Sequence, residues 1–590
     1  MILPQLIPAI LLFYHQILLA WAQEIFLADA LAHAPNHLLV RLKDLLDFGP
    51  LERVCADYRH RSGPGCPPTY PISLLVRAIL VGWLYVLSLR KLEERLHCDL
   101  VARWFVGCQP GDPIPDHSTL GRFELWLVFN HPDLYFSTFL SQIDRCFPQE
   151  RRAIQIGDTY AMLANAADEG LVKRIRHVCL RLTMELQESF PGKFESYLQG
   201  FDWCALFGVK PEKADKEHLG EGLMDKASRA QRLERTVLAA LDFRQRVGSL
   251  LDGYDKQQYG VVRGWCSYLD KVLADEVLVE RDAAGQPVKA SELPNEKKGD
   301  FRLISATDPE ATLRVHGETQ EDVALGYNVQ VSVTPNAFIR ETKAYTGADP
   351  DQSGVATLVS AQKERQEASG EAVQLPPKLI YDMAAGNGKT RTDVKEASDG
   401  KTQLVAKSMP YDQRSERFGP YDFTLSADGK VLTCPNGNTS TIAYPSGSGD
   451  GRTFRFLACQ CWHGEPPKRM KAASSEQLAA RCPLWKQCRD SRQGPGAMRQ
   501  VFISDYRAQV LAAEAYNRTE DFRREMKLRP LVERVIFELT NYNGARDCRR
   551  RGQLAADFQA KMCATSHNLK QWVRKLSRVA PARRQAALAG

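Results

Sequence analysis

Three carboxylates lie where the sequence predicts strand ends or a helix, and carboxylates in such places can bind divalent metal. Asp158 follows an apolar run that includes Ile154 and Ile156, and such a run is typical of a buried strand. Asp382 ends a second apolar run, in "PKLIYD", and Glu533 lies in a predicted helix. Burying a carboxylate at a strand tip is costly unless positive charge meets it. We therefore predict that the three carboxylates share divalent metal.

A shared metal site of this kind suits phosphodiester cleavage. Two hard cations roughly 3.5–4 Å apart can activate the attacking oxygen and stabilise the leaving oxygen. Mg²⁺, or Mn²⁺ in its place, takes oxygen ligands and keeps waters and substrate phosphates in its shell. A single Asp after a strand is weak evidence, since turns favour Asp. Three carboxylates at matching places in one element order are stronger evidence.

The elements that would position these carboxylates are predicted strands and helices in alternation. "LGYNVQVSV" and "AFIRETKAY", separated by "TPN", predict a β-hairpin. "GVATLVSAQKERQEA" predicts an amphipathic helix, "TQLVAKS" a short strand, and residues 513–542 one helix that carries Glu533. A last basic helix contains "SHNLKQWVRKL". With two insertions set aside, the order is strand, strand, strand, helix, strand, helix, strand, helix, which is the ribonuclease H-like order.

At 590 residues the chain is too long for one ordinary core, so we expect several modules. The predicted fold class is mixed α/β: a helical N-terminal DNA-binding domain and a ribonuclease H-like catalytic domain, interrupted by a helical insertion and a Cys-containing, loop-rich insertion. The polar stretch "RDAAGQPVKASELPNEKKGD" predicts a linker. The expected boundaries are 1–23 for an N-terminal extension, 24–145 for the DNA-binding domain, 150–166 and 300–408 for the catalytic core, 167–299 for the helical insertion, 409–505 for the Cys-containing insertion, and 506–590 for the Glu533 helix and the basic C-terminal helix.

The N-terminal helices include a candidate DNA-reading segment. "PDHSTLGRFELWLVF" predicts a helix with Asp116 and Ser118 as capping candidates. Two short helices joined by a turn are compatible with a helix-turn-helix reader. Generic helical packing, or a role in dimerisation, is the alternative. The candidate DNA contacts in this segment are Arg90, Lys91, Arg95 and Arg122.

The charge of the chain is modest overall and concentrated near its C-terminus. Lys plus Arg at 78 against Asp plus Glu at 71 gives a net charge of +7, which names no partner by itself. Beyond residue 545, basic residues far outnumber Asp547 and Asp557. Such a helix and tail suit a phosphate backbone. A solvated helix face is the alternative on charge alone.

The 15 cysteines are too few for a disulfide-dense protein, but five of them cluster. Singly placed cysteines such as Cys55, Cys179, Cys204 and Cys563 predict small buried hydrophobes. The cluster lies within residues 434–488, where we predict a structural zinc site, with ordinary reduced thiols as the alternative. Neither local spacing is ideal, because one is Cys-x-Cys and the other places five residues between cysteines. The clustered cysteines are Cys434, Cys459, Cys461, Cys482 and Cys488. The predicted ligands are Cys434, Cys461, Cys482 and Cys488, with Cys459 as the alternative to Cys461.

The first 23 residues resemble a signal peptide only in part. The segment "MILPQLIPAILLFYHQILLAWAQ" is apolar and ends near an Ala-Trp-Ala sequence, but the first charge is Glu24, so it lacks a positive n-region. It is also short and interrupted for a membrane span. We expect no membrane attachment and a bacterial cytoplasmic, nucleoid-associated protein.

Several segments resemble bacterial insertion-sequence transposases of the DDE type. "PPTYPISLLVRAILVGWLYVLSLRKLEERLHCDLVARWFVG" with "PDHSTLGRF" is similar to the helical N-terminal domain of one group of these enzymes. "GDTYAMLANAA" and "LIYDMAAGNGK" resemble the first-Asp and second-Asp segments, and "TDPEATLRVHG" with "GYNVQVSV" a stretch between them. "RPLVERVIFEL" carries the Arg-x-x-x-Glu pattern at Arg529 and Glu533, and "SHNLKQW" the usual end. The resemblance implies that Asp158, Asp382 and Glu533 are catalytic.

The sequence departs from the family pattern at several positions. The family often has Tyr three residues before the Arg and Lys seven after the Glu, where this chain has Met526 and Thr540. A phosphate-contacting Lys is therefore missing or replaced by a neighbour such as Arg546. Gly386 and Asn387 stand near the usual Gly-Tyr pair.

The resemblance implies a transposase that binds the terminal inverted repeats of an insertion sequence and target DNA. Such an enzyme catalyses metal-dependent DNA cleavage and strand transfer, and we expect it to act as a homodimer on DNA. Arg529 and Arg546 join the candidate DNA contacts. The first alternative is a catalytically inactive DNA-binding derivative, to which Thr540 points. The second is a ribonuclease H-like nuclease without strand transfer, which the helical N-terminal domain argues against.

Overall fold

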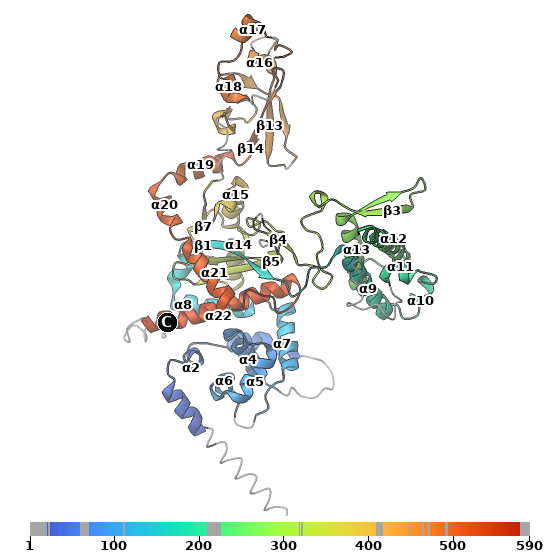
Figure 1. The fold of residues 1–590 in the computed structure, drawn as a ribbon. Helices are drawn as coiled ribbons and strands as arrows, with labels where there is room; N and C mark the ends of the chain where they lie inside the picture. The colour runs from blue at the N-terminus through green and yellow to red at the C-terminus, as the bar shows by residue number, and fades with distance from the viewer. Residues whose placement is uncertain are drawn as a thin grey trace, which may run out of the picture. The chain divides into compact units, whose positions relative to one another are not determined.

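The computed structural model (Figure 1) has a mixed α/β fold that divides into two compact units. Unit 1 contains residues 1–151, 158–354 and 531–590, and unit 2 contains residues 152–157 and 355–530. The residues described are 21, 24–59, 70–109, 112–208, 226–317, 319, 323–408, 417–447, 449–462, 465–469, 473–489 and 494–578. Most of the N-terminal extension predicted at 1–23 thus lies outside the described residues.

The N-terminal part of unit 1 is helical, as the apolar periodicity predicts. Three helices begin with side-chain caps, because Ser88, Asp99 and Asp116 accept hydrogen bonds from backbone N–H groups that a helix start leaves unpaired. Of the described helices, no single one is long and apolar enough to span a membrane. The helices are α2 (Leu38–Lys43), α3 (Gly49–Cys55), α4 (Ile72–Leu84), α5 (Leu89–Cys98), α6 (Leu100–Val106), α7 (His117–Asn130) and α8 (Leu134–Cys146).

Unit 1 also holds the antiparallel part of a six-stranded sheet. The predicted hairpin is confirmed as β5 (Val323–Val333) and β6 (Ile339–Thr346), which pair antiparallel. β4 (Thr312–Val315) pairs with the start of β5. The strand order is β4-β5-β1-β7-β8, with β6 also paired to β5 and with β1 (Gln155–Leu163) shared by both units.

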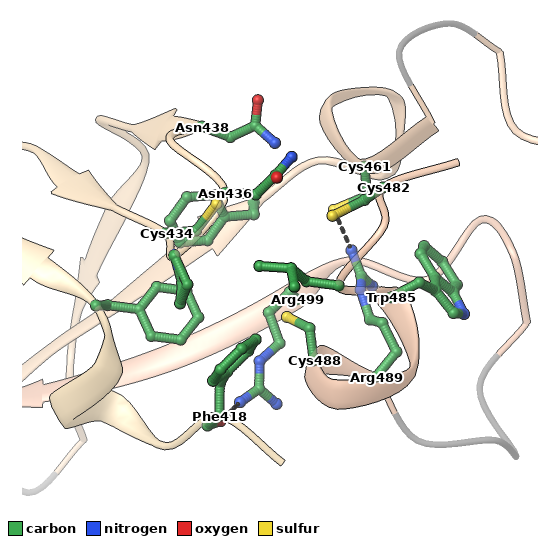
Figure 2. A pocket seen from close by; sticks show the side chains of 14 residues that line it. Phe418, Cys434, Asn436, Asn438, Cys461, Cys482, Trp485, Cys488, Arg489 and Arg499 are labelled. Atoms are coloured by element: carbon green, nitrogen blue, oxygen red, sulfur yellow. Dashed lines mark hydrogen bonds between the residues drawn. The ribbon is translucent and has the colours of Figure 1, made fainter. Parts of the chain in front are cut away.

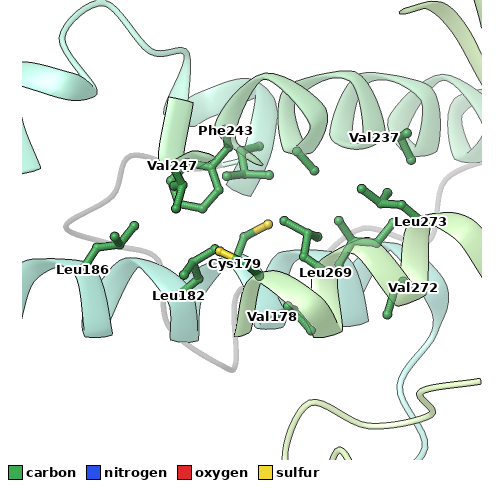
Figure 3. Close-up of a cluster of buried hydrophobic side chains, with 14 of the residues drawn as sticks. Val178, Cys179, Leu182, Leu186, Val237, Phe243, Val247, Leu269, Val272 and Leu273 are labelled. Carbon is green, nitrogen blue, oxygen red and sulfur yellow. The ribbon is translucent and has the colours of Figure 1, made fainter. Parts of the chain in front are cut away.

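A bundle of helices in unit 1 occupies the region of the predicted helical insertion. Its long helices are α9 (Leu171–Ser189), α12 (Lys226–Leu251) and α13 (Gly260–Glu276), joined by short α10 (Phe194–Tyr197) and α11 (Trp203–Phe207). Their apolar faces meet in one buried cluster (Figure 3) that includes Leu182, Phe243 and Leu269. The cysteine prediction is confirmed at Cys179, which is buried here, but wrong at Cys204, which is exposed.

The linker predicted after the bundle is wrong, because these residues form a hairpin. β2 (Val277–Arg281) and β3 (Pro287–Glu292) pair antiparallel around a turn with Gly285 at φ +78°. β3 was not predicted as a strand because only one of its six positions is buried, so it lacks the apolar signal of a buried strand.

Unit 2 contains the parallel part of the sheet. The first residues of β1 pair parallel with β7 (Lys378–Ile380), and β7 pairs parallel with β8 (Gln403–Val405). The predicted helix is confirmed as α14 (Thr357–Ala368), and α15 (Gly388–Ala397) precedes β8. Buried Leu358, Leu379, Tyr381 and Val394 belong to the core that these elements share.

The Cys-containing segment of unit 2 has more regular structure than predicted. It holds two three-stranded antiparallel sheets, ordered β11-β10-β9 and β12-β13-β14, around a core of six buried apolar side chains. The elements are β9 (Thr424–Leu425), β10 (Leu432–Thr433), β11 (Thr439–Ser440), β12 (Ala443–Pro445), β13 (Gly451–Phe456), α16 (Ala458–Trp462), α17 (Ser475–Ala479), α18 (Trp485–Cys488) and β14 (Arg499–Ser504).

The single helix predicted over residues 513–542 is wrong, because the chain forms three helices there: α19 (Arg507–Asn517), α20 (Glu520–Met526) and α21 (Pro530–Tyr542). Thr519 caps α20 by accepting from Phe522 N, which starts a new helix where a continuous one was expected. Pro530 is the first residue of α21, where its missing N–H costs nothing.

The last helix, α22 (Gln553–Arg578), is a core element of unit 1 rather than a solvated one. It packs on β6 and α8, and its residues 555–569 are buried. Lys561 on this helix forms ion pairs with Asp133 and Asp557 at 3.0 and 3.1 Å. The solvated-face interpretation of this helix is therefore wrong.

Candidate active site

Asp158 lies inside β1 and not at its tip, which corrects the prediction. It is the fourth residue of a strand that continues to Leu163. The strand extends because the backbone finds partners beyond the apolar run: Leu163 N donates to Arg546 O at 2.8 Å, and Ala164 N donates to Leu325 O at 2.9 Å. The Asp158 side chain is half-buried, and its Oδ1 accepts from Thr159 N at 2.9 Å.

Asp382 lies at a strand end, as predicted. Asp382 is the second residue after β7 and is half-buried. Its side chain accepts a hydrogen bond from Ala384 N at 3.0 Å, which caps a short 3₁₀ turn. The Gly-rich turn after it has a steric reason, since a Cβ on Gly386 would lie 2.0 Å from Lys407 O. Asn387 then caps α15 by accepting from Thr390 N at 2.8 Å. Gly386 and Asn387 thus hold the turn next to Asp382.

Glu533 lies in the first turn of α21 with an exposed side chain. Seven residues later, the Thr540 hydroxyl donates to Ile536 O at 3.0 Å within the same helix. That bond satisfies the hydroxyl locally, as Ser and Thr side chains in helices often do.

Backbone hydrogen bonds connect the elements that carry Asp158 and Glu533 within unit 1. The segment that follows α21 pairs with the end of β1, because Leu163 N donates to Arg546 O and Cys548 N donates to Leu163 O, both at 2.8 Å. Asp382 belongs to unit 2. Across the described residues, no group of three or more His, Cys, Asp or Glu side chains is close enough to hold a metal ion. A common metal site for the three carboxylates stays a prediction.

The candidate DNA contacts of the N-terminal helices differ in side-chain exposure and in whether they pair with other residues. Arg90 and Lys91 in the first turn of α5, and Arg122 on α7, have exposed side chains. Arg95 is engaged, since it pairs with Asp99 at 3.0 Å and lies 3.9 Å from the Tyr85 ring centroid.

A hydrogen-bond clamp fixes α5 against α7. Glu93 Oε2 accepts from the His117 backbone N–H at 2.9 Å and lies 2.8 Å from His117 Nδ1. The bond from the His117 backbone is the first cause that lowers the pKa of Glu93, and the bond to its ring is the second. The exposed side chains of Arg90 and Lys91 on α5 and of Arg122 on α7 therefore lie on two helices that this contact joins.

Several basic residues near the C-terminus have partners within unit 1, which the sequence did not predict. Arg550 pairs with the buried Glu124 of α7 at 2.7 Å, and Glu124 also accepts from Trp83 Nε1 at 3.1 Å. Arg549 lies 3.8 Å from the Trp83 ring centroid. Of the two remaining candidate contacts, Arg546 is exposed and Arg529 is half-buried. A charge run in sequence does not reveal which members have buried partners.

Two families match the chain. Residues 28–124 match the family described as Transposase domain (DUF772), and residues 433–573 match the family described as Transposase DDE domain. Together these matches support an insertion-sequence DDE transposase. Comparison with curated proteins and with solved structures found no match.

The two matched ranges divide the candidate residues of the chain. The first range contains the α5 bases and Arg122, and the second contains Glu533. Asp158 and Asp382 lie outside both ranges, so their assignment depends on the sequence pattern and on their place in the sheet.

Proposed function

We propose that this protein binds the terminal inverted repeats of an insertion sequence as a homodimer and catalyses metal-dependent DNA cleavage and strand transfer. The observation that carries the proposal is the pair of transposase-domain matches, at 28–124 and 433–573. The first covers the helices with exposed bases, and the second covers the helix with Glu533.

A ribonuclease H-like catalytic core is part of the proposal. The strand order β4-β5-β1-β7-β8 supports it, with an antiparallel β5–β6 hairpin on one side of β1 and parallel β7 and β8 on the other. The central strand of this order carries Asp158, and the strand beside it leads to Asp382.

The register of β1 and β7 supports a shared site for Asp158 and Asp382. Ile156 pairs with Ile380 in the parallel ladder, and each Asp lies two residues beyond its paired Ile. Neighbouring strands lie about 4.8 Å apart and side chains alternate with period two. Two residues beyond a paired position, the side chains are expected at one level and on one face. Glu533 would join them through the pairing of residues 546–548 with the end of β1.

The three carboxylates offer the oxygen donors that Mg²⁺ or Mn²⁺ takes. When bound, such ions supply activation of the attacking oxygen and stabilisation of the leaving oxygen. The chain's own part is to hold the carboxylates on β1, after β7 and on α21, and to hold DNA through the exposed bases Arg90, Lys91 and Arg122.

The test uses DNA fragments that carry the element's ends, with Mg²⁺ for cleavage and EDTA for binding. Asp158→Asn, Asp382→Asn and Glu533→Gln should each reduce cleavage by about 10³-fold or more, because each removes several kcal/mol of metal-mediated stabilisation. End binding in EDTA should stay unchanged. Glu520→Gln, an exposed carboxylate change on α20, is the matched control and should cleave normally. Full cleavage by either Asp variant would refute the assignment.

The inactive DNA-binding derivative is the second candidate, because Thr540 stands where a Lys is expected and bonds to its own helix. It predicts end binding by the unmodified protein with no cleavage in Mg²⁺ or Mn²⁺. A nuclease without strand transfer would cleave the ends but never join them to a target plasmid.

A further inference from the structure

Four cysteines line one small cavity in unit 2 (Figure 2): Cys434, Cys461, Cys482 and Cys488. The cavity volume is about 20 Å³. A site needs roughly 10–15 Å³ of such volume to hold one water molecule. The cavity is therefore large enough to hold one particle of the size of a water molecule or an ion.

Local turns and short helices place the four cysteines around the cavity from separate segments of residues 434–488. Cys434 begins the turn between β10 and β11, where Gly437 N donates to Cys434 O at 2.9 Å and Gly437 adopts φ +83°. Cys482 N donates to Cys461 O at 2.8 Å, which joins α16 to the segment before α18. Cys488 is the last residue of α18. The fold thus uses backbone hydrogen bonds to collect residues that the sequence separates.

The fifth cysteine of the cluster is excluded from the cavity. Cys459 is exposed and does not line it, although it is only two residues from Cys461 on α16. Four of the five clustered cysteines thus line the cavity, and four is the number of ligands in a structural zinc site.

Positive charge also lies beside the thiols. Arg489 is buried, and its Nη2 donates to Cys461 Sγ at 3.1 Å. Arg499 also lines the cavity. Thiols carry protons that must leave before their sulfurs can bind zinc. A metal that binds thiolate would displace these protons, and donors such as Arg489 would stabilise the sulfur charge.

We propose that Cys434, Cys461, Cys482 and Cys488 bind one zinc ion that holds this segment of unit 2 together. A cross-link would help this segment to hold its shape, since its main apolar cluster has six buried side chains among the described residues. As stated above, no described set of three ligand residues is within metal-holding distance. Binding therefore requires side-chain rotations that bring the four sulfurs to about 2.3 Å from one centre.

The experiment measures zinc in the full-length protein, purified under reducing conditions without chelator. We expect about one zinc ion per chain, as for a four-cysteine site. Changing any one of the four cavity cysteines to Ser should remove most of the zinc. Cys459→Ser is the matched control and should keep it. Because a Ser variant can fail to fold, Co²⁺ is also added to the chelator-treated unmodified protein, where thiolate-to-cobalt absorption bands should appear and Zn²⁺ should abolish them.

Three outcomes would overturn the proposal. The first is that the unmodified protein contains no zinc and gives no cobalt bands. The second is that the Cys459→Ser protein loses zinc as the other variants do. The third is that Cys461 and Cys482 form a disulfide in protein purified from reducing cells. The result is independent of catalysis, since Asp158→Asn should keep its zinc whether or not it cleaves DNA.

Discussion

At the scale of single residues, the segment "SHNLKQW" has a structural explanation. Asn568 accepts from Ile339 N and donates to Ile339 O, both at 2.8 Å, so its amide satisfies both backbone groups of that β6 residue. His567 Nε2 lies 2.9 Å from Ala337 O, and its Nδ1 lies 3.5 Å from Glu538 Oε2. Buried backbone groups need partners, and α22 supplies them to the start of β6.

His567 should make unit 1 less stable at acid pH. Burial is the first cause that lowers the pKa of His567 below its ordinary value of 6.5. The unfolded chain then binds more protons just below pH 6.5, so the free energy of unfolding falls as the pH drops through that range. His567→Gln, which keeps a donor for Ala337 O, should show a smaller drop in urea midpoint between pH 7.5 and 5.5. An unchanged pH dependence in this variant would assign the effect to other groups.

At the scale of elements, the turn after α21 is what connects the Glu533 helix to β1. Gly544 adopts φ +76°, and a Cβ there would lie 2.8 Å from Val86 Cγ1. Val86 itself has φ +55°, which is unusual for a β-branched residue. Val86, in the turn between α4 and α5, therefore lies too close to Gly544 for a Cβ to be added there without a shift.

Gly544→Ala should destabilise unit 1 by about 1–3 kcal/mol, because a non-glycine residue would be held at positive φ against a close neighbour. Urea unfolding followed by circular dichroism measures the change. Gly253→Ala is the matched control, since that glycine has no atom within 4 Å of an added Cβ and no positive φ. Equal stability of the two variants would show that the turn can relax.

At the scale of the whole molecule, the count of 78 Lys and Arg residues overstates the number of basic side chains that are available to DNA. Arg550 pairs with Glu124, Lys561 pairs with Asp557, and Arg549 lies over Trp83. Partners inside the protein compete with phosphates for these side chains. The exposed Arg90, Lys91 and Arg122 are the better candidates for an electrostatic contact.

Binding to end DNA should therefore depend on salt through the N-terminal bases. Arg90→Ala, Lys91→Ala and Arg122→Ala should each reduce the slope of log Kd against log salt by about 1. Arg523→Ala is the control, since that exposed Arg on α20 pairs with Glu520 and should leave the slope unchanged. Gel-shift titrations at several salt concentrations measure the slopes. The idea fails if none of the three N-terminal variants changes it.

The sequence by itself determined the elements whose signals are local. Apolar periodicity and caps such as Asp116 predicted the N-terminal helices, and alternation predicted β5 and β6. Strand-end chemistry predicted the place of Asp382. These features depend on neighbouring residues, so a single sequence suffices.

Only the tertiary structure decided features that depend on distant partners. Asp158 lies within β1 because Arg546 and Leu325, far along the chain, extend the strand beyond the apolar run. The basic C-terminal helix belongs to the core of unit 1 because it packs on β6 and α8, and Asp133 supplies an ion-pair partner for its buried Lys561. The choice between Cys459 and Cys461, which the sequence left open, was decided by the fold, because Cys461 lines the cavity and Cys459 does not. Burial, ion pairing and strand extension each require a second segment, and sequence periodicity carries no information about which segment that is.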